Sequence, residues 1–170
     1  MGGVRQDHGR KRGELNLSSD DLGGEIHPAG TVEAVHILLV QSDESSRRGY
    51  RVNLELDGFR VSEAGDGAEA LRLARYDLPE LVVLDLLLPV LDGWETLGEL
   101  KTDETLRSIP VVILTASSEE RDELRARERG AIAFVARPVC IEDLIRAVRR
   151  ALVQFPGGGN GRHRTPVAEL

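Results

Sequence analysis

The sequence predicts an α/β protein built on an open parallel sheet with helices on both faces. Short apolar runs alternate five times with longer segments whose apolar residues recur at helical spacing. The central run, residues 82–84, is apolar at every position, as in a parallel strand buried on both faces. Asp85 follows this run directly, ahead of a loop marked by Pro89 and Gly93. Ligands collect at the carboxyl ends of strands in such sheets, so Asp85 is a candidate nucleophile or metal ligand.

Two strand–helix pairs come first along the chain. They are predicted over residues 36–40, 45–56, 59–64 and 68–75. The first helix ends at Asp57-Gly58, a pair that favours a turn. Asp66 precedes the second helix and suits its N-cap, because a carboxylate accepts hydrogen bonds from the free N–H groups of the first turn.

Three further pairs follow. They are predicted over residues 81–84, 94–101, 111–114, 118–129, 133–136 and 141–152. Gly98 weakens the first of these helices slightly, and Gly130 ends the second, which is very rich in charge. The last helix has a continuous apolar face. Five strictly alternating strands and helices predict a flavodoxin-like, doubly wound (βα)5 fold with the strand order 2-1-3-4-5.

We expect one folded domain, residues 34–154, between two ends without fixed structure. Residues 1–33 are polar, Gly-rich and aperiodic, and residues 155–170 begin with a Gly-rich run. These compositions predict a disordered N-terminal extension and a flexible C-terminal tail.

Charge and composition exclude several classes of function. The formal net charge is −7, and the 4 basic and 5 acidic residues of 1–30 cancel the 2 basic and 1 acidic residues of 153–170. The whole charge therefore lies in the folded segment, which argues against nucleic-acid binding because phosphate contacts need a basic face. The single cysteine, Cys140, leaves no internal disulfide and no cysteine-based metal site. No stretch approaches the ~20 apolar residues of a membrane span, so we expect a cytoplasmic protein without membrane contact.

Five segments carry a resemblance to a known family. They are ILLV at 37–40, AGDGAEAL at 64–71, LPELVVLDLLLPVLDGWE at 78–95, IPVVILTA at 109–116 and GAIAFVARP at 130–138. Together, in this order and spacing, they are far more specific than any one alone. Residues 34–153 resemble the receiver domain of two-component response regulators, and this match covers nearly the whole folded segment.

The resemblance implies a phosphoacceptor. Asp85 falls on the aspartate that takes a phosphoryl group from a histidine kinase or a phosphotransfer protein, with Mg²⁺ bound beside it. Thr115 falls on the switch hydroxyl and Phe134 on the switch aromatic. Arg137 falls on a lysine, and the peptide bond before the next residue, Pro138, is usually cis in the family. These residue types suit the chemistry, because a carboxylate attacks phosphorus readily and the phosphoryl oxygens need neutralising charge.

The chain departs from the family at the metal site. Two adjacent acids normally follow the first strand, and here these positions are Gln41 and Ser42. Mg²⁺ prefers hard oxygen ligands and usually one or two carboxylates, so we expect its binding to be weakened or lost. The ligands that remain are Asp85, the carbonyl of Leu87, Ser42 as a weak ligand and Asp43 if it bends inward. Asp43 also suits the first turn of a helix, where the dipole favours acids, and we prefer that interpretation. No other cofactor is expected.

Arg137 keeps the positive charge of the lysine that it replaces. A guanidinium is bulkier than an ammonium group and binds phosphate well through its planar fork. It is also able to pair with Asp85 before phosphorylation, in partial replacement of the metal.

Three functions remain open on these residues. The first is a single-domain response regulator, because the chain after residue 152 is too short for a DNA-binding module. Its output would be contact with an unknown downstream protein, or a homodimer, through the face of residues 118–129, 133–136 and 141–152. The second is a receiver-like interaction module that works without phosphorylation and has a degenerate metal site. The third, a haloacid-dehalogenase-type enzyme, needs a second aspartate where Leu87 stands. We prefer the first, keep the second as the alternative and expect no enzyme.

Overall fold

The computed structural model describes residues 33–116 and 119–156 of the chain. Nearly all of the predicted disordered extension, residues 1–33, and of the predicted flexible tail, residues 155–170, lies outside the described residues.

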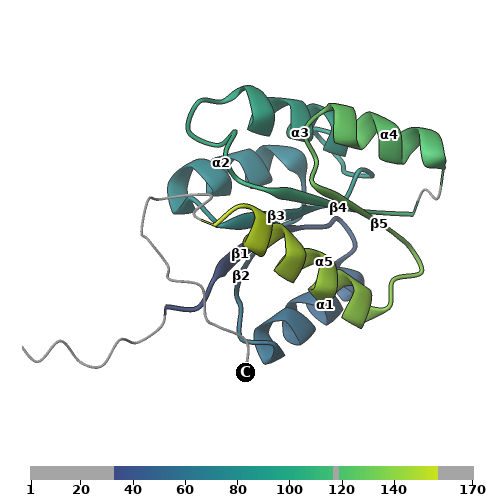
Figure 1. Ribbon diagram of the computed structural model, residues 1–170. Helices are drawn as coiled ribbons and strands as arrows, with labels where there is room; N and C mark the ends of the chain where they lie inside the picture. Colours follow the sequence, from purple (N-terminus) through teal and green to yellow (C-terminus); the bar gives the residue numbers. More distant parts are fainter. Residues whose placement is uncertain (1–32, 117–118, 157–170) are drawn as a thin grey trace, which may run out of the picture. The chain divides into compact units, whose positions relative to one another are not determined.

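Five parallel strands form one sheet in the predicted order, β2-β1-β3-β4-β5 (Figure 1). The strands are β1 (His36–Val40), β2 (Arg60–Ala64), β3 (Leu81–Leu84), β4 (Val111–Thr115) and β5 (Ala133–Ala136). In the register, Val40 of β1 lies opposite Leu84 of β3, and Thr115 of β4 lies opposite Ala136 of β5. Residues that end or follow these four strands therefore meet at one side of the sheet, which we call the carboxyl edge.

Five helices alternate with the strands. They are α1 (Glu44–Leu56), α2 (Gly67–Asp77), α3 (Gly93–Thr102), α4 (Glu120–Glu128) and α5 (Ile141–Gln154). Figure 1 shows α2, α3 and α4 on one face of the sheet and α1 and α5 on the other, which is the doubly wound arrangement that the alternation predicts. No helix in the described part of the chain has the length and apolar character that a membrane span requires.

The central strand explains why its sequence is apolar at every position. Val82 and Leu84 belong to the core under α2, α3 and α4, whereas Leu81 and Val83 belong to the core under α1 and α5. All four side chains are fully buried. Burial of each aliphatic side chain of this size stabilises the folded state by roughly 1.5–3 kcal/mol. Because β3 packs into both cores, the residue that follows it, Asp85, is held in a fixed place.

Aspartate side chains cap the starts of three helices, and Asp66 caps α2 as the sequence predicts. α1 starts one residue earlier than predicted, because the Asp43 carboxylate accepts the backbone N–H of Ser46 at 2.7 Å. α3 follows Asp92, which forms a capping box with Glu95. All three caps lie in loops that follow the carboxyl ends of strands, so they also fix the direction of those loops.

α4 is shorter than the predicted helix over residues 118–129, of which residue 118 lies outside the described residues. It begins at Glu120, and Glu119 makes no side-chain cap hydrogen bond. The longer helix was predicted from a segment that is very rich in charge. Ala126 is the only buried residue of α4, so packing against the sheet does little to set where this helix begins. Five other predicted elements have ends that differ from the observed ones by one or two residues. Their predicted ranges were 59–64, 68–75, 94–101, 111–114 and 141–152.

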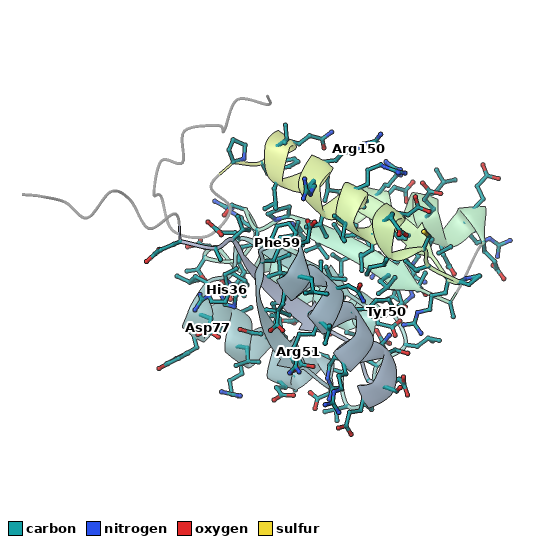
Figure 2. The ribbon with its side chains drawn as sticks, turned by 90° about the horizontal axis from the view of Figure 1, so that it is seen from below. His36, Tyr50, Arg51, Phe59, Asp77 and Arg150 are labelled. Carbon is teal, nitrogen blue, oxygen red and sulfur yellow. The ribbon has the colours of Figure 1, made fainter. Side chains whose placement is uncertain are left out.

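His36 lies at the opposite side of the sheet from the carboxyl edge, at the start of β1 (Figure 2). It is 5% exposed, and its Nε2 shares a hydrogen bond of 2.5 Å with Ser62 Oγ of β2. Burial lowers the pKa of the imidazole, and the positive charge of Arg60 lowers it further, while Asp77 and Glu80 oppose the shift. The folded protein therefore prefers neutral His36.

The lowered pKa of His36 makes stability depend on pH. The unfolded chain binds this proton near the ordinary pKa of 6.5, whereas the folded protein resists it. Stability is thus full above pH 6.5 and falls as the pH decreases toward the folded pKa, by at most about 1.4 kcal/mol per pH unit. We expect His36→Gln to flatten the pH dependence of urea unfolding in this window. The two proteins have the same carboxylates, so only His36 can make their pH dependences differ. Parallel curves of unfolding free energy against pH would therefore contradict the assignment.

Candidate functional site

Four polar residues from four strands meet at the carboxyl edge. Gln41 follows β1, Asp85 follows β3, Thr115 ends β4 and Arg137 follows β5. The parallel register brings them together although almost 100 residues separate the first from the last. Gln41, Asp85 and Thr115 are buried, at 1%, 2% and 1% exposure.

Asp85 is a buried carboxylate with both oxygens engaged. Its Oδ2 accepts a hydrogen bond from Arg137 Nη2 at 2.7 Å, and its Oδ1 accepts one from the backbone N–H of Leu87 at 3.1 Å. A buried charge is costly unless it is paired and hydrogen-bonded, and both conditions are met here. The expected ion pair between Asp85 and Arg137 is therefore present.

Arg137 reaches Asp85 from a position fixed by the sheet. Its backbone N–H donates to the carbonyl of Thr115 at 2.7 Å, and the peptide bond to Pro138 is cis, as the resemblance implies. The side chain is 25% exposed, so the guanidinium lies at the mouth of the site. Its Nε is buried and has no acceptor among the described residues.

The two residues in place of the acid pair use their side-chain oxygens in hydrogen bonds to the backbone. Gln41 Oε1 accepts the backbone N–H of Asp43 at 3.4 Å, and Ser42 Oγ donates to the carbonyl of Leu87 at 3.3 Å. The carboxylate of Asp43 caps α1 through Ser46, which holds its pKa below the usual range, with help from the charges of Arg137 and Arg47.

Arg47 is a contributor that the sequence did not reveal. Its Nη1 donates to the carbonyl of Gln41 at 2.7 Å, and its Nε lies 3.3 Å from the carboxylate of Glu63. The arginine thus fixes the turn between β1 and α1 from the side of β2. Contacts between residues of different elements leave no mark in hydrophobic periodicity, so no local pattern would have found it.

Thr115 lines a pocket of about 360 Å³ together with residues of the loop that follows Asp85. The pocket is also lined by Leu86, Leu87, Leu88, Asp92, Trp94 and Asp122. Phe134, next along β5, is half-buried and packs against the core on the α4 side of the sheet. The threonine and the phenylalanine lie on neighbouring strands, as the switch assignment requires, while the switch itself stays a prediction.

Trp94 joins α3 to α4. The guanidinium carbon of Arg125 lies 4.3 Å from the centre of the indole ring, and that of Arg129 lies 5.7 Å from it. Cation–π contacts of this kind contribute about 0.5–1 kcal/mol at exposed sites. Because Trp94 also lines the pocket beside Thr115, the indole connects that pocket with α4.

The carboxyl edge does not fit a tight Mg²⁺ site. Among residues 33–116 and 119–156, no three His, Cys, Asp or Glu side chains are grouped closely enough to hold a metal ion. Asp85 supplies one carboxylate, and Arg137 occupies one of its oxygens. The carbonyl of Leu87 is present but already accepts from Ser42. Mg²⁺ would have to displace a cation and find further oxygen ligands among neutral groups.

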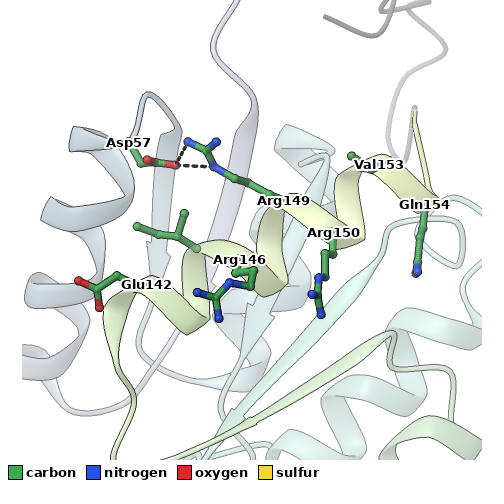
Figure 3. A pocket seen from close by; sticks show the side chains of 8 residues that line it. Asp57, Glu142, Arg146, Arg149, Arg150, Val153 and Gln154 are labelled. Atoms are coloured by element: carbon green, nitrogen blue, oxygen red, sulfur yellow. Dashed lines mark hydrogen bonds and ion pairs between the residues drawn. The ribbon is translucent and has the colours of Figure 1, made fainter. Parts of the chain in front are cut away.

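A larger groove of about 810 Å³ runs along the outer side of α5 (Figure 3). Asp85 is not among its lining residues, and two of its three arginines are paired locally. Arg149 Nη2 lies 2.7 Å from Asp57, and Arg146 Nη1 lies 2.8 Å from Asp143. The groove brings together no nucleophile and no buried polar group, so the carboxyl edge is the stronger candidate site.

Comparison with known proteins shows the family to which this chain is related. Residues 37–149 match the family model described as the response regulator receiver domain. The chain is 34% identical over 116 residues to the polar-differentiation response regulator DivK of Brucella ovis, covering 68% of this chain and 94% of DivK. It is 37% identical over 123 residues to the response regulator PleD of Caulobacter vibrioides. That match covers 72% of this chain and only 27% of PleD, so the chain spans about a quarter of that relative.

A solved structure gives the same fold. The receiver domain of the sensor histidine kinase PA1611 from Pseudomonas aeruginosa PAO1 superimposes with a TM-score of 0.66 at 28% identity, covering 71% of this chain and 98% of that domain. That structure has a magnesium ion coordinated in its active-site cleft.

The loop after Asp85 depends on a close approach by Gly93. A Cβ at Gly93 would lie 2.3 Å from the carbonyl oxygen of Asp85 and 2.3 Å from Leu86 Cα, both backbone atoms. We expect Gly93→Ala to cost about 1–3 kcal/mol of stability in denaturant unfolding, because backbone cannot yield as a flexible side chain does. Gly98→Ala is the matched control, since nothing lies within 4 Å of its Cβ, and should raise stability by about 0.5–1 kcal/mol. Equal stabilities of the two variants would contradict the close approach.

Proposed function

This chain belongs to the response regulator receiver domain family, and we propose that it is a single-domain regulator that accepts a phosphoryl group on Asp85. The donor is a histidine kinase or a phosphotransfer protein, and the role is signalling in the cytoplasm rather than metabolic catalysis. The observation that carries the proposal is the convergence of Asp85, Thr115 and Arg137 at the carboxyl edge.

The site supports nucleophilic attack by Asp85. The carboxylate is held at a fixed place between a cation and a backbone N–H. When it forms a bond to phosphorus, Arg137 can turn from the carboxylate to the new phosphoryl oxygens, which suit its planar fork. Thr115 borders the same space and would donate its hydroxyl to the phosphoryl group.

The signal then passes to α4 and β5. Drawing Thr115 inward would free space for the ring of Phe134, which lies on the neighbouring strand. Charge-assisted hydrogen bonds to the phosphoryl group contribute about 1.5–3 kcal/mol each, enough to move a two-state equilibrium by one to two decades. The output face is formed by α4, β5 and α5, where Leu124 is 56% exposed among charged residues. A downstream protein or a second copy of the chain would bind there.

The alternative is a receiver-like interaction module that works without phosphorylation. The observation that favours it is the ion pair itself, because Arg137 already neutralises Asp85 and supplies a preset site. In that case the α4–β5–α5 face would bind its partner with the same affinity in the wild type and in variants of Asp85.

Phosphorylation at Asp85 separates these two functions. We expect acetyl phosphate or a phosphorylated histidine kinase to label the wild type once, and we expect Asp85→Asn to lose the label because the amide is not a nucleophile. Intact-protein mass spectrometry measures the mass of the added phosphoryl group. Asp92→Asn, in the same loop, is the matched control and should keep the label. Persistent labelling of Asp85→Asn would refute the assignment, and failure to label the wild type would favour the alternative.

Mg²⁺ binding should be weak in the wild type. Titration followed by Trp94 fluorescence should give a dissociation constant above about 1 mM, because one carboxylate and several neutral oxygens bind this ion poorly. Gln41→Asp combined with Ser42→Asp should tighten binding at least about tenfold, and should destabilise the metal-free protein because three carboxylates then repel one another. Submillimolar affinity of the wild type would contradict the prediction and point to Asp43 as a ligand.

A further inference from the structure

Two buried hydrogen-bond donors at the carboxyl edge have no acceptor. They are Nε2 of Gln41 and Nε of Arg137, and neither has a partner among the described residues. Gln41 as a whole is 1% exposed. A buried donor without an acceptor is costly and rare in native proteins, so a site that retains two of them calls for an explanation.

The oxygens around these donors are already engaged. Both oxygens of Asp85 accept hydrogen bonds, from Arg137 and from the N–H of Leu87. The carbonyl of Leu87 accepts a hydrogen bond from Ser42, and Oε1 of Gln41 accepts one from the backbone N–H of Asp43. The site therefore has donors without acceptors, the reverse of what a divalent cation requires. The two unpaired donors could instead bind the oxygens of an anion.

Gln41 and Asp85 lie next to each other at the carboxyl edge. Val40 lies opposite Leu84 in the register, and the backbone N–H of Asp85 donates to the carbonyl of Val40 at 3.0 Å. Gln41 and Asp85 are thus the first residues past two paired strands. Arg47 fixes the backbone of Gln41 through its carbonyl, so the amide sits on a rigid support.

We propose that this is an oxyanion site, in which Arg137 and the Gln41 amide stabilise the phosphoryl group so that Asp85 is phosphorylated without a divalent cation. The inference rests on the proposed function and extends it, because it assigns Gln41 a role that the acid pair of the family does not have.

The transfer step needs no further reactant. One oxygen of Asp85 forms a bond to the phosphorus of a phosphohistidine or of acetyl phosphate, and the P–N or P–O bond to the leaving group breaks. The imidazole or acetate leaves with the electron pair of that bond. Arg137 stays protonated throughout, and its charge together with the Gln41 N–H meets the negative charge that gathers on the phosphoryl oxygens.

The test is labelling of the full chain by acetyl phosphate in excess EDTA and in excess Mg²⁺, followed by intact-protein mass spectrometry. We expect initial rates in the two buffers to agree within about twofold, because the protein's own donors replace the ion. Labelling that requires Mg²⁺ would overturn this inference and leave the proposed function standing. No labelling in either buffer would overturn both.

Substitution of Gln41 gives a second readout. Gln41→Leu removes the amide at similar size, and its labelling rate in EDTA should fall by about 10²-fold, the loss typical of removing one oxyanion donor. Gln154→Leu, the same exchange at an exposed position of α5, is the matched control and should keep the wild-type rate. An unchanged rate for Gln41→Leu would refute the role of the amide. The comparison of buffers on the wild type holds even if Gln41→Leu does not fold.

Discussion

The ion pair between Asp85 and Arg137 is the interaction on which the carboxyl edge depends. It joins the end of β3, the most deeply buried strand, to the end of β5, at the margin of the sheet. Burying a carboxylate is costly unless a cation and hydrogen bonds compensate its charge, and Arg137 supplies both. Removing only one member of a buried pair is therefore far more damaging than replacing both, since the remaining charge stays buried and uncompensated.

The side chains at this edge differ from the two adjacent acids that are usual in the family. Where two acids would attract a cation, Gln41 presents an amide and Ser42 uses its hydroxyl on a carbonyl. The positive charge comes instead from the protein, on Arg137. A guanidinium is fixed in number and position by the fold, whereas a dissolved ion depends on its concentration.

The sequence predicted the fold and the convergence of the site well, and the side-chain contacts poorly. Alternation of apolar runs with helical segments sufficed for the strand order, and the resemblance to receiver domains implied that Thr115 and Arg137 lie beside Asp85. The support from Arg47, the buried donor of Gln41 and the close approach of Gly93 could not be predicted. Each depends on a rotamer or on a backbone distance across elements, and hydrophobic periodicity carries information on neither.

The thin anchoring of α4 has a consequence for how the domain would respond to its surroundings. Ala126 is the only buried residue of this helix, so releasing α4 from the sheet exposes little apolar surface. The cation–π contacts of Arg125 and Arg129 with Trp94 join the end of this helix to α3. Local opening of α4 should have a small heat-capacity change and a small denaturant dependence, unlike global unfolding, which exposes both cores. We therefore expect α4 to open before β3 and the carboxyl edge unfold.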